Sequence, residues 1–546
     1  MKIGQKRSVP NLSANWFIAL ALAFVLGVFL GGQDPLSPVL HWLPRLPRSL
    51  RFASAVDPLP RLTVDMPFDS YRRLLQEREE ALRQGVTISS HADFVTATIR
   101  LNESAVPVDL RFRDGPAEHL QEAEGWQFDV RTRDDRTLDG MDRFYLLDPA
   151  DNNWLNQWAF AHSLERAGIL TTRYVFVDVV FNGKSWGTYA LQEGFGDALM
   201  TRNNRVAGVL LAYDTDFLWR SIAHFGEAQH AYADPVSKLA STAFPFLEID
   251  AFSDAAIDRD AARSGQREAA LSRMRALQAG RIPASEVFDL ETYARFLSLA
   301  DLWGSSEAVS VVNLRYYYDP GTERVEPIGF VGNPLSSEER LPLTATYGDA
   351  ALQAAYAREA ERVSDPSYLE ALRADVEEEL LRLQRLLEPA AGELAPPWDA
   401  LEERQMWMRQ SLAPVQPVFA YLGDANAGVS ATIEIDVASV VALPIEVVGF
   451  DINGTTFLEA DPAWIRTDLG PDLVTVQAEQ IVLLASTSPS PRYVRFHLPT
   501  TEIARLDGES LFLAPTEISV ATRILGLEGR QLTPARQGAP ASLIVP

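Results

Sequence analysis

The sequence predicts an α+β protein in three parts: an N-terminal transmembrane helix, a domain that mixes helices and strands, and a C-terminal all-β sandwich. An uncharged apolar run covers residues 16–32. Strand-like and helix-like runs then follow one another over residues 61–412, and strand-like runs fill residues 413–546. At 546 residues the chain is too long for one ordinary core, so more than one domain is expected.

The N-terminal segment has the composition of a membrane anchor, because about 20 apolar residues are enough to cross a bilayer. Basic residues within 1–15 precede the uncharged run at 16–32. They predict a cytoplasmic N-terminus, a single-pass span in a bacterial inner membrane and an extracytoplasmic bulk. The alternative is a cleaved signal peptide, since residues 53–55 read ASA, although they lie well beyond the apolar run. Residues 33–60 are interpreted as a linker.

The first part of the mixed domain combines one helix with a sheet. The run at 68–85 has helical spacing, with Asp65 as a possible cap and Gly85 as its stop. Short alternating runs between residues 92 and 147 predict a twisted antiparallel sheet.

A hairpin is the clearest local signal in the chain. Asn182 and Gly183 separate two runs rich in β-branched and aromatic residues, so we expect two strands joined by a tight turn between Arg173 and Glu193. Helices are expected before it, at 152–168, and far after it, at 368–389.

The composition excludes several classes of function. A formal charge of −25 disfavours sequence-independent nucleic-acid binding, so no nucleic-acid partner is expected. The absence of cysteine excludes thiolate chemistry and cysteine-based metal sites. After the N-terminal segment, the only lysines are Lys184 and Lys238, so a phosphate-binding lysine would have to be one of these two.

Two positions invite a functional interpretation. The stretch EPIGFVGNP, at 326–334, reads as a strand that runs into a polar turn, a common place for reactive groups, yet the residue at its tip is Val331. Glu193 ends the second strand of the predicted hairpin. Its carboxylate would either pair with a cation or cap a helix that begins near Phe195.

Four stretches between Arg61 and Leu335 resemble the CotH family, the spore-coat protein H kinases and their membrane-anchored relatives. They are LRFRDGPAEHL, the run from GWQFDVRTR to AHSLERAG, RYVFVDVVFNGKSWGTYALQEGFGDALMTRN, and NLRYYYDPGTERVEPIGFVGNP. The resemblance implies that residues 61–412 form an atypical protein-kinase-like domain. Active members of the family bind ATP and a divalent metal and phosphorylate proteins.

Some positions match the residues that the resemblance implies. Glu193 corresponds to the family's glutamate at the end of the hairpin, and Asn313 to an asparagine that could bind metal through its amide oxygen. Ahead of Asn313, Glu307 is the remaining acid that could take a catalytic or metal-binding role. Arg111 and His119 lie where the family has basic and histidine residues.

Other positions depart from the family. Gly125 stands where a lysine is expected, and Val331 stands where relatives carry an acid. The candidate phosphate-binding cations are then Arg111, Arg131, Arg133 and Lys184. Loss of a metal ligand and a phosphate-binding cation together would impair phosphoryl transfer.

These departures lead to three hypotheses. In the first, the chain is a pseudokinase that acts as a binding or scaffolding module at the cell envelope, with a protein or envelope partner. In the second, it is an active protein kinase that binds ATP and Mg²⁺ or Mn²⁺ through relocated ligands. If the protein is inactive, no cofactor is expected. In the third, it is a structural envelope protein.

Overall fold

The structure is a computed structural model that describes residues 58–102, 104–225, 247–252, 257, 259–338, 348–423, 432–465, 473–477, 479–485, 491–501 and 517–538. The chain divides into two compact units, Met1–Pro58 and Leu59–Pro546, and the description below concerns the second. The predicted membrane helix at 16–32 and the predicted linker up to residue 57 lie outside the described residues. Within the described ranges, none of the helices combines the length and apolar character that a membrane span requires.

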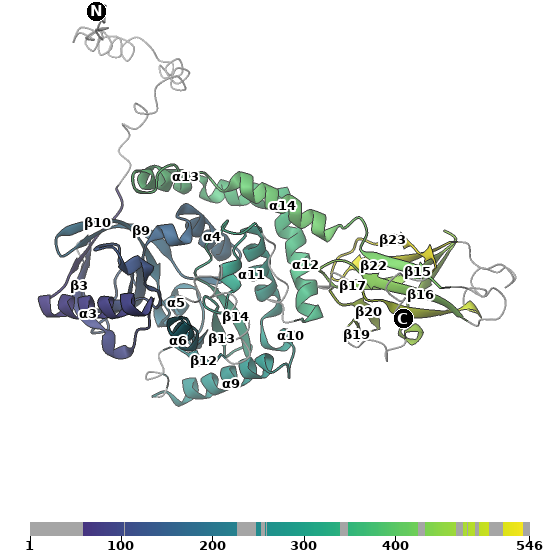
Figure 1. Cartoon of the computed structure of the whole chain (residues 1–546), viewed down its shortest axis with the longest axis horizontal. Coiled ribbons are helices and arrows are strands. Elements are labelled where there is room, and N and C mark those ends of the chain that lie inside the picture. Colours follow the sequence, from purple (N-terminus) through teal and green to yellow (C-terminus); the bar gives the residue numbers. More distant parts are fainter. Residues whose placement is uncertain are drawn as a thin grey trace, which may run out of the picture. The chain divides into compact units, whose positions relative to one another are not determined.

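The first part of the described chain is a closed barrel of seven strands (Figure 1). Around the barrel, the order is β1, β3, β4, β6, β7, β10, β9, and β9 pairs with β1 in parallel while the other neighbours are antiparallel. The strands are β1 (Arg61–Asp65), β3 (Val95–Leu101), β4 (Ser104–Phe112), β6 (Phe128–Thr132), β7 (Arg143–Leu147), β9 (Tyr174–Phe181) and β10 (Lys184–Glu193). A short pair, β2 (Val86–Thr87) and β5 (Gly115–Pro116), lies outside this ring.

Aromatic side chains dominate the barrel core. The rings of Phe128 and Phe181 stack with centroids 5.9 Å apart, and Trp186 stacks on Phe181 at 4.2 Å. Helix α3 (Phe68–Gln84) packs on the barrel, and its Tyr71 stacks on Trp126 at 6.0 Å. The interior is therefore packed with side chains.

The tight turn between β9 and β10 confirms the predicted hairpin. Asn182 and Gly183 both have positive φ, 47° and 81°. This is the conformation of a type I′ turn, which matches the twist of the strands that it joins. The Asn182 side chain also accepts a hydrogen bond of 2.7 Å from the backbone N–H of Met66, which ties the turn to the chain just after β1.

A five-stranded mixed sheet and several helices form the next layer (Figure 1). The sheet order is β12, β11, β13, β14, β8, and β14 pairs with β8 in parallel. The strands are β8 (Leu170–Thr171), β11 (Val209–Tyr213), β12 (Ile249–Ala251), β13 (Arg315–Asp319) and β14 (Arg324–Gly329). The helices are α4 (Leu155–Arg166), α5 (Asp197–Arg202), α6 (Asp216–Phe225), α9 (Ala261–Gln278), α10 (Ala284–Val287), α11 (Leu290–Leu302), α12 (Ala350–Ser364), α13 (Pro366–Ala391) and α14 (Trp398–Leu412).

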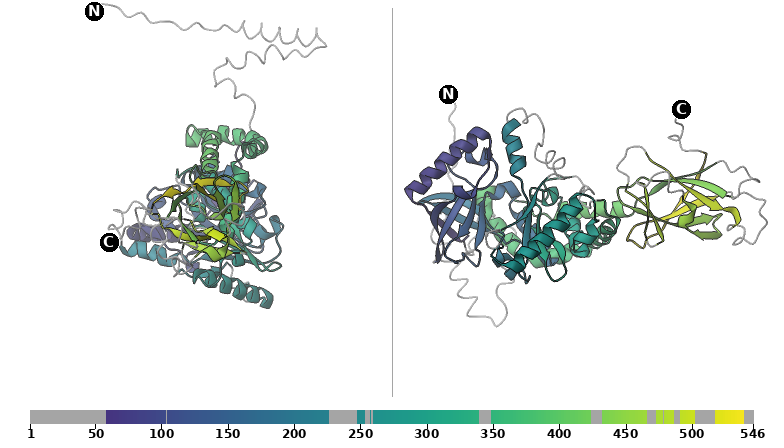
Figure 2. Two further views of the ribbon diagram at one scale, coloured as in Figure 1. Left: turned by 90° about the vertical axis from the view of Figure 1, so that its right-hand side faces the viewer. Right: turned by 90° about the horizontal axis from the view of Figure 1, so that it is seen from below.

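The C-terminal part consists of two β-sheets (Figure 2). Their inner faces pack together, and the rings of Phe450 and Phe496, one from each sheet, lie 5.3 Å apart. The first sheet holds β15 (Val418–Leu422), β16 (Thr432–Ser439), β21 (Val494–Pro499) and β24 (Arg536–Gln537). The second holds β17 (Ile445–Ile452), β18 (Thr456–Glu459), β19 (Val474–Gln477), β20 (Gln480–Leu483), β22 (Ile518–Ile524) and β23 (Gln531–Pro534).

The predicted fold class, an α+β protein with a protein-kinase-like domain, is wrong. The region expected to contribute a twisted antiparallel sheet to a kinase-like domain is instead part of a closed barrel, followed by a separate five-stranded sheet. The missed element is β1, Arg61–Asp65, which pairs with β3 on one side and β9 on the other. Because β1 pairs with the strand at each edge of the sheet, the sheet closes into a barrel and has no unpaired edge strand.

Candidate functional site

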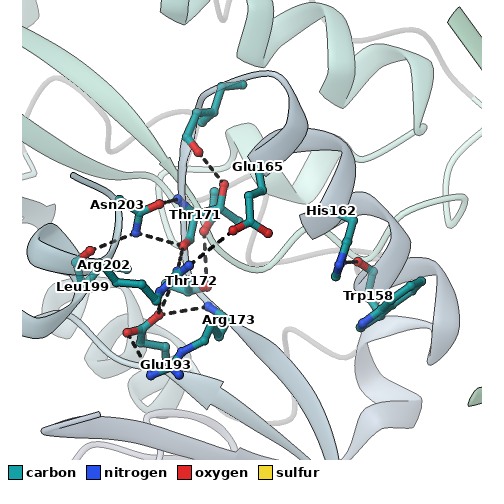
Figure 3. A network of polar contacts seen from close by, with 12 residues as sticks. Trp158, His162, Glu165, Thr171, Thr172, Arg173, Glu193, Leu199, Arg202 and Asn203 are labelled. Carbon is teal, nitrogen blue, oxygen red and sulfur yellow. Dashed lines mark hydrogen bonds and ion pairs between the residues drawn. The ribbon is translucent and has the colours of Figure 1, made fainter. Parts of the chain in front are cut away.

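Glu193 lies at the end of β10, where its side chain is only 2% exposed. The carboxylate accepts a hydrogen bond of 3.1 Å from the backbone N–H of Arg173 and one of 2.9 Å from Nε of Arg202. The Arg173 guanidinium approaches the other carboxylate oxygen at 3.5 Å (Figure 3). Two cations and one backbone donor therefore compensate a buried negative charge.

Arg202 connects this carboxylate to two other segments. It is the last residue of α5, and its Nη2 also donates to the backbone carbonyl of Thr171. Its Nη1 donates to Oε1 of Glu165 on α4 at 3.4 Å (Figure 3). The Glu193 network thus joins the barrel strand β10 to α4, α5 and the segment around β8. This is a structural role, and Gly196 rather than Glu193 is the N-cap of α5.

A hollow of about 250 Å³ lies beside this network. Two guanidiniums, those of Arg173 and Arg202, face it, but their charges are balanced by Glu193 and Glu165. Its lining consists of Trp158, Ala161, His162, Glu165, Thr171, Thr172, Arg173, Tyr174, Val175 and Arg202. With this balance, the hollow has no strong electrostatic preference for a charged ligand.

The structure brings together Glu307, Asn313 and the turn after β14. Nδ2 of Asn313 donates to the backbone carbonyl of Glu307 at 3.2 Å, and the Glu307 carboxylate accepts a hydrogen bond of 2.9 Å from Asn333. Their side chains thus form a small hydrogen-bonded cluster. Within the described ranges, no group of three or more histidine, aspartate or glutamate side chains is placed to hold a metal ion. No hydrogen bond or ion pair of the described residues joins this cluster to Glu193.

The turn after β14 is fixed by buried polar side chains. Gln157 donates to the carbonyl of Phe330 at 2.8 Å and accepts from the backbone N–H of Gly332 at 3.1 Å. The hydroxyl of Ser305 donates to the carbonyl of Gly332 at 2.6 Å. A Cβ at Gly332 would clash with that hydroxyl and lie 2.6 Å from the ring of Phe160. The turn is therefore held by packing as well as by hydrogen bonds.

Val331 packs in an apolar cluster and is only 4% exposed. The other members of the cluster are Leu170, Phe195, Leu199, Met200, Leu210, Tyr317, Ile328 and Phe330. A carboxylate at this position would be surrounded by hydrocarbon, which disfavours its charged form. The apolar residue that the sequence places in this turn thus fits its surroundings.

Each cation predicted to contact phosphate has a carboxylate partner. The pairs are Arg111–Asp129, Arg131–Asp109, Arg133–Asp109 and Lys184–Glu124. Two of them are direct cross-strand neighbours, Arg111 opposite Asp129 and Arg131 opposite Asp109, on β4 and β6. Opposite charges placed in this way stabilise a strand pair. These cations therefore have a partner within the barrel.

The remaining two positions taken from the resemblance are also explained locally. Gly125, at the position expected to hold lysine, has φ of +86°, a conformation that disfavours residues with a side chain. His119 lies within hydrogen-bonding distance of the carbonyl of Pro116, 2.9 Å from Nδ1, and burial lowers its pKa.

Sequence reasoning did not single out Arg113, Arg143 and Arg315, which, like several other arginines of the described part of the chain, form no ion pair with a described carboxylate. Burial and the positive charge of Arg113 both lower the pKa of Arg315, to about 10. The available signal was the aromatic context of Arg315, which opens the run RYYY at the start of β13. The sequence spacing of Arg113 and Arg143 gives no indication of a functional role.

Comparison with known proteins adds no relative. No protein-family model matches the chain, and no curated protein has a significantly similar sequence. The resemblance to the CotH family stays a prediction from the motifs.

Proposed function

We propose that this protein is a non-catalytic binding or scaffolding module of the cell envelope. The observation that carries the proposal is the pairing of all four predicted phosphate-binding cations with carboxylates. Arg111 and Arg131, whose side chains are 20% and 29% exposed, must give up a carboxylate partner before either can hold a phosphate, whereas the exposed pairs of Arg133 and Lys184 contribute little.

The two predicted catalytic regions also favour binding over phosphoryl transfer. That reaction needs a metal and a phosphate-binding cation at one place. The carboxylate of Glu193 is held by two arginines, while Glu307 and Asn313 belong to another hydrogen-bond cluster. We therefore propose that the domain works without ATP and without Mg²⁺ or Mn²⁺.

The partner that we propose is a protein or another envelope component. The formal charge of −25 disfavours nucleic acid. An extracytoplasmic location is inferred from residues 16–32 alone, which lie outside the described residues.

Calorimetric titration of the full chain with ATP, with and without Mg²⁺ or Mn²⁺, tests the proposal, together with an assay of phosphate transfer from labelled ATP. We expect neither metal-dependent ATP binding nor transfer. Transfer that requires the metal and disappears in Asn313→Ala or Glu307→Ala would overturn the proposal. Arg100→Gln, which removes a cation from an exposed pair with Asp65, is the matched control.

A further inference from the structure

Tyr145 and Arg315 both contact the rings of Phe195 and Phe330, where the barrel meets the turn after β14. The ring of Tyr145, on β7, lies 5.6 Å from Phe330 and 6.5 Å from Phe195. The guanidinium carbon of Arg315 lies 5.7 Å from each of these two rings and 6.0 Å from Phe252. The phenol and the guanidinium are therefore held at one place by a rigid aromatic base.

Arg315 keeps its charge in this setting without a carboxylate partner among the described residues. Its Nη1 donates to the carbonyls of Val312 and Leu314, at 2.8 and 2.9 Å. Its Nε is buried and makes no hydrogen bond to any described residue. A buried donor without a partner is costly, so this nitrogen would gain from an acceptor supplied by a ligand.

Two further arginines belong to the same part of the barrel. Arg143 is two residues before Tyr145 on β7 and hence on the same face of that strand, while Arg113 follows β4. Both are half-buried, and neither forms an ion pair with a described carboxylate. Their charges and that of Arg315 all lower the pKa of Tyr145, although burial is the larger effect and raises that pKa to about 12.

Asp129, a carboxylate whose charge acts on Tyr145, is already paired. Asp129 lies directly opposite Tyr145 on β6, and it binds Arg111 at 3.0 Å. Arg113, Arg143 and Arg315 carry three positive charges here, and Asp142 beside Arg143 offsets one of them, in a chain whose formal charge is −25. A local field of this sign attracts an anionic group that the rest of the surface repels.

We propose that Arg113, Arg143, Arg315 and the hydroxyl of Tyr145 bind an oxyanion, a carboxylate or phosphate group carried by the partner of this module. Guanidinium groups match both oxyanions because their N–H donors are arranged in a planar fork. The phenol stays protonated at neutral pH and donates a further hydrogen bond. This inference rests on the proposed binding role and adds the chemical class of the ligand; it requires no metal ion.

The test is calorimetric titration of the full chain with inorganic phosphate and, separately, with acetate, in buffers freed of divalent metal ions by a chelating resin. We expect saturable binding that weakens as salt concentration rises, since the contacts are ionic. Tighter binding of phosphate indicates a phosphorylated ligand, and tighter binding of acetate indicates a carboxylated one. Arg113→Gln and Arg143→Gln should each raise Kd about tenfold, as expected for the loss of one charge-assisted hydrogen bond.

The matched control is Arg100→Gln, which removes a barrel arginine that is paired with Asp65. Its Kd should equal that of the unmodified chain, and circular dichroism should report the same secondary structure for all variants. Three results would overturn the inference: no saturable binding of either anion, an unchanged Kd in the Arg113→Gln/Arg143→Gln double variant, or an equal loss in the control. Metal-dependent phosphate transfer, by contrast, would contradict the proposed function. It would not decide the anion site, which these metal-free titrations test separately.

Discussion

Replacing Val331 by aspartate separates two views of the turn after β14. If the turn were a metal-binding loop that had lost its acid, the new carboxylate would restore a ligand. The structure instead places this side chain, 4% exposed, in an apolar cluster. The substitution then loses about 1.5–3 kcal/mol of hydrophobic burial and leaves an unsatisfied polar group that costs about 1–3 kcal/mol. We expect the free energy of unfolding to fall by roughly 3–5 kcal/mol.

Urea unfolding followed by circular dichroism measures this loss, with Val331→Ala as the control that removes packing without adding a charge. Burial raises the folded-state pKa of the new carboxyl above its unfolded value of about 3.9. The deficit should therefore be smallest below about pH 4 and should grow as the pH rises towards the folded-state pKa. A Val331→Asp variant that is as stable as the unmodified chain at neutral pH, and that binds Mg²⁺ or ATP, would refute this reasoning.

Three further predictions concern stability. Arg202→Met should lower the free energy of unfolding by roughly 1.5–3 kcal/mol, because the buried carboxylate of Glu193 loses one charge-assisted hydrogen bond but keeps Arg173; urea titration at neutral pH checks this, and an unchanged midpoint contradicts it. Burial raises the pKa of Asp114 from 3.8 to about 6, so the unfolded chain loses this proton first and stability falls as the pH rises between these values. Asp114→Asn should flatten that part of the measured stability profile, and an unaltered slope would exclude the assignment. Gly332→Ala should lower the free energy of unfolding by about 1–3 kcal/mol, because its Cβ clashes with the core. Gly265→Ala, on α9 with open space around it, should raise the free energy of unfolding by up to about 1 kcal/mol. Thermal unfolding of both variants distinguishes the two effects, and equal shifts would contradict the packing argument.

Local signals in the sequence predicted the local structure well. The Asn182–Gly183 pair specifies its own turn, and Gly85 ends α3 with a φ of 74°, as expected for a residue without a side chain. The strand β1 could not be found in this way. Its five residues, Arg61–Asp65, alternate between polar and apolar, but the run is short and stands alone before a helix, and it forms a strand because β3 and β9, later in the chain, pair with it. Asp65, expected as a helix cap, ends that strand.

The candidate site was harder to predict because its charges depend on register. The sequence identified Arg111 and Arg131 as cations near a possible site, but not that each lies opposite an aspartate on the neighbouring strand. Glu193 was found as a notable carboxylate, and one interpretation was that it pairs with a cation. Arg173 lies opposite it at the open end of the predicted hairpin, whereas Arg202, at the end of α5, belongs to a segment that no local pattern relates to it.

The parallel pairing of β1 with β9 has a consequence for synthesis on the ribosome. At about 5–20 residues per second, β9 emerges roughly ten seconds after β1. During that interval one edge of β1 has no neighbour, and the nascent chain presents a growing sheet that cannot yet close. Exposed strand edges promote intermolecular association. Substitutions that slow formation of the β9–β10 hairpin should therefore increase aggregation during expression more than they alter the equilibrium of the finished chain.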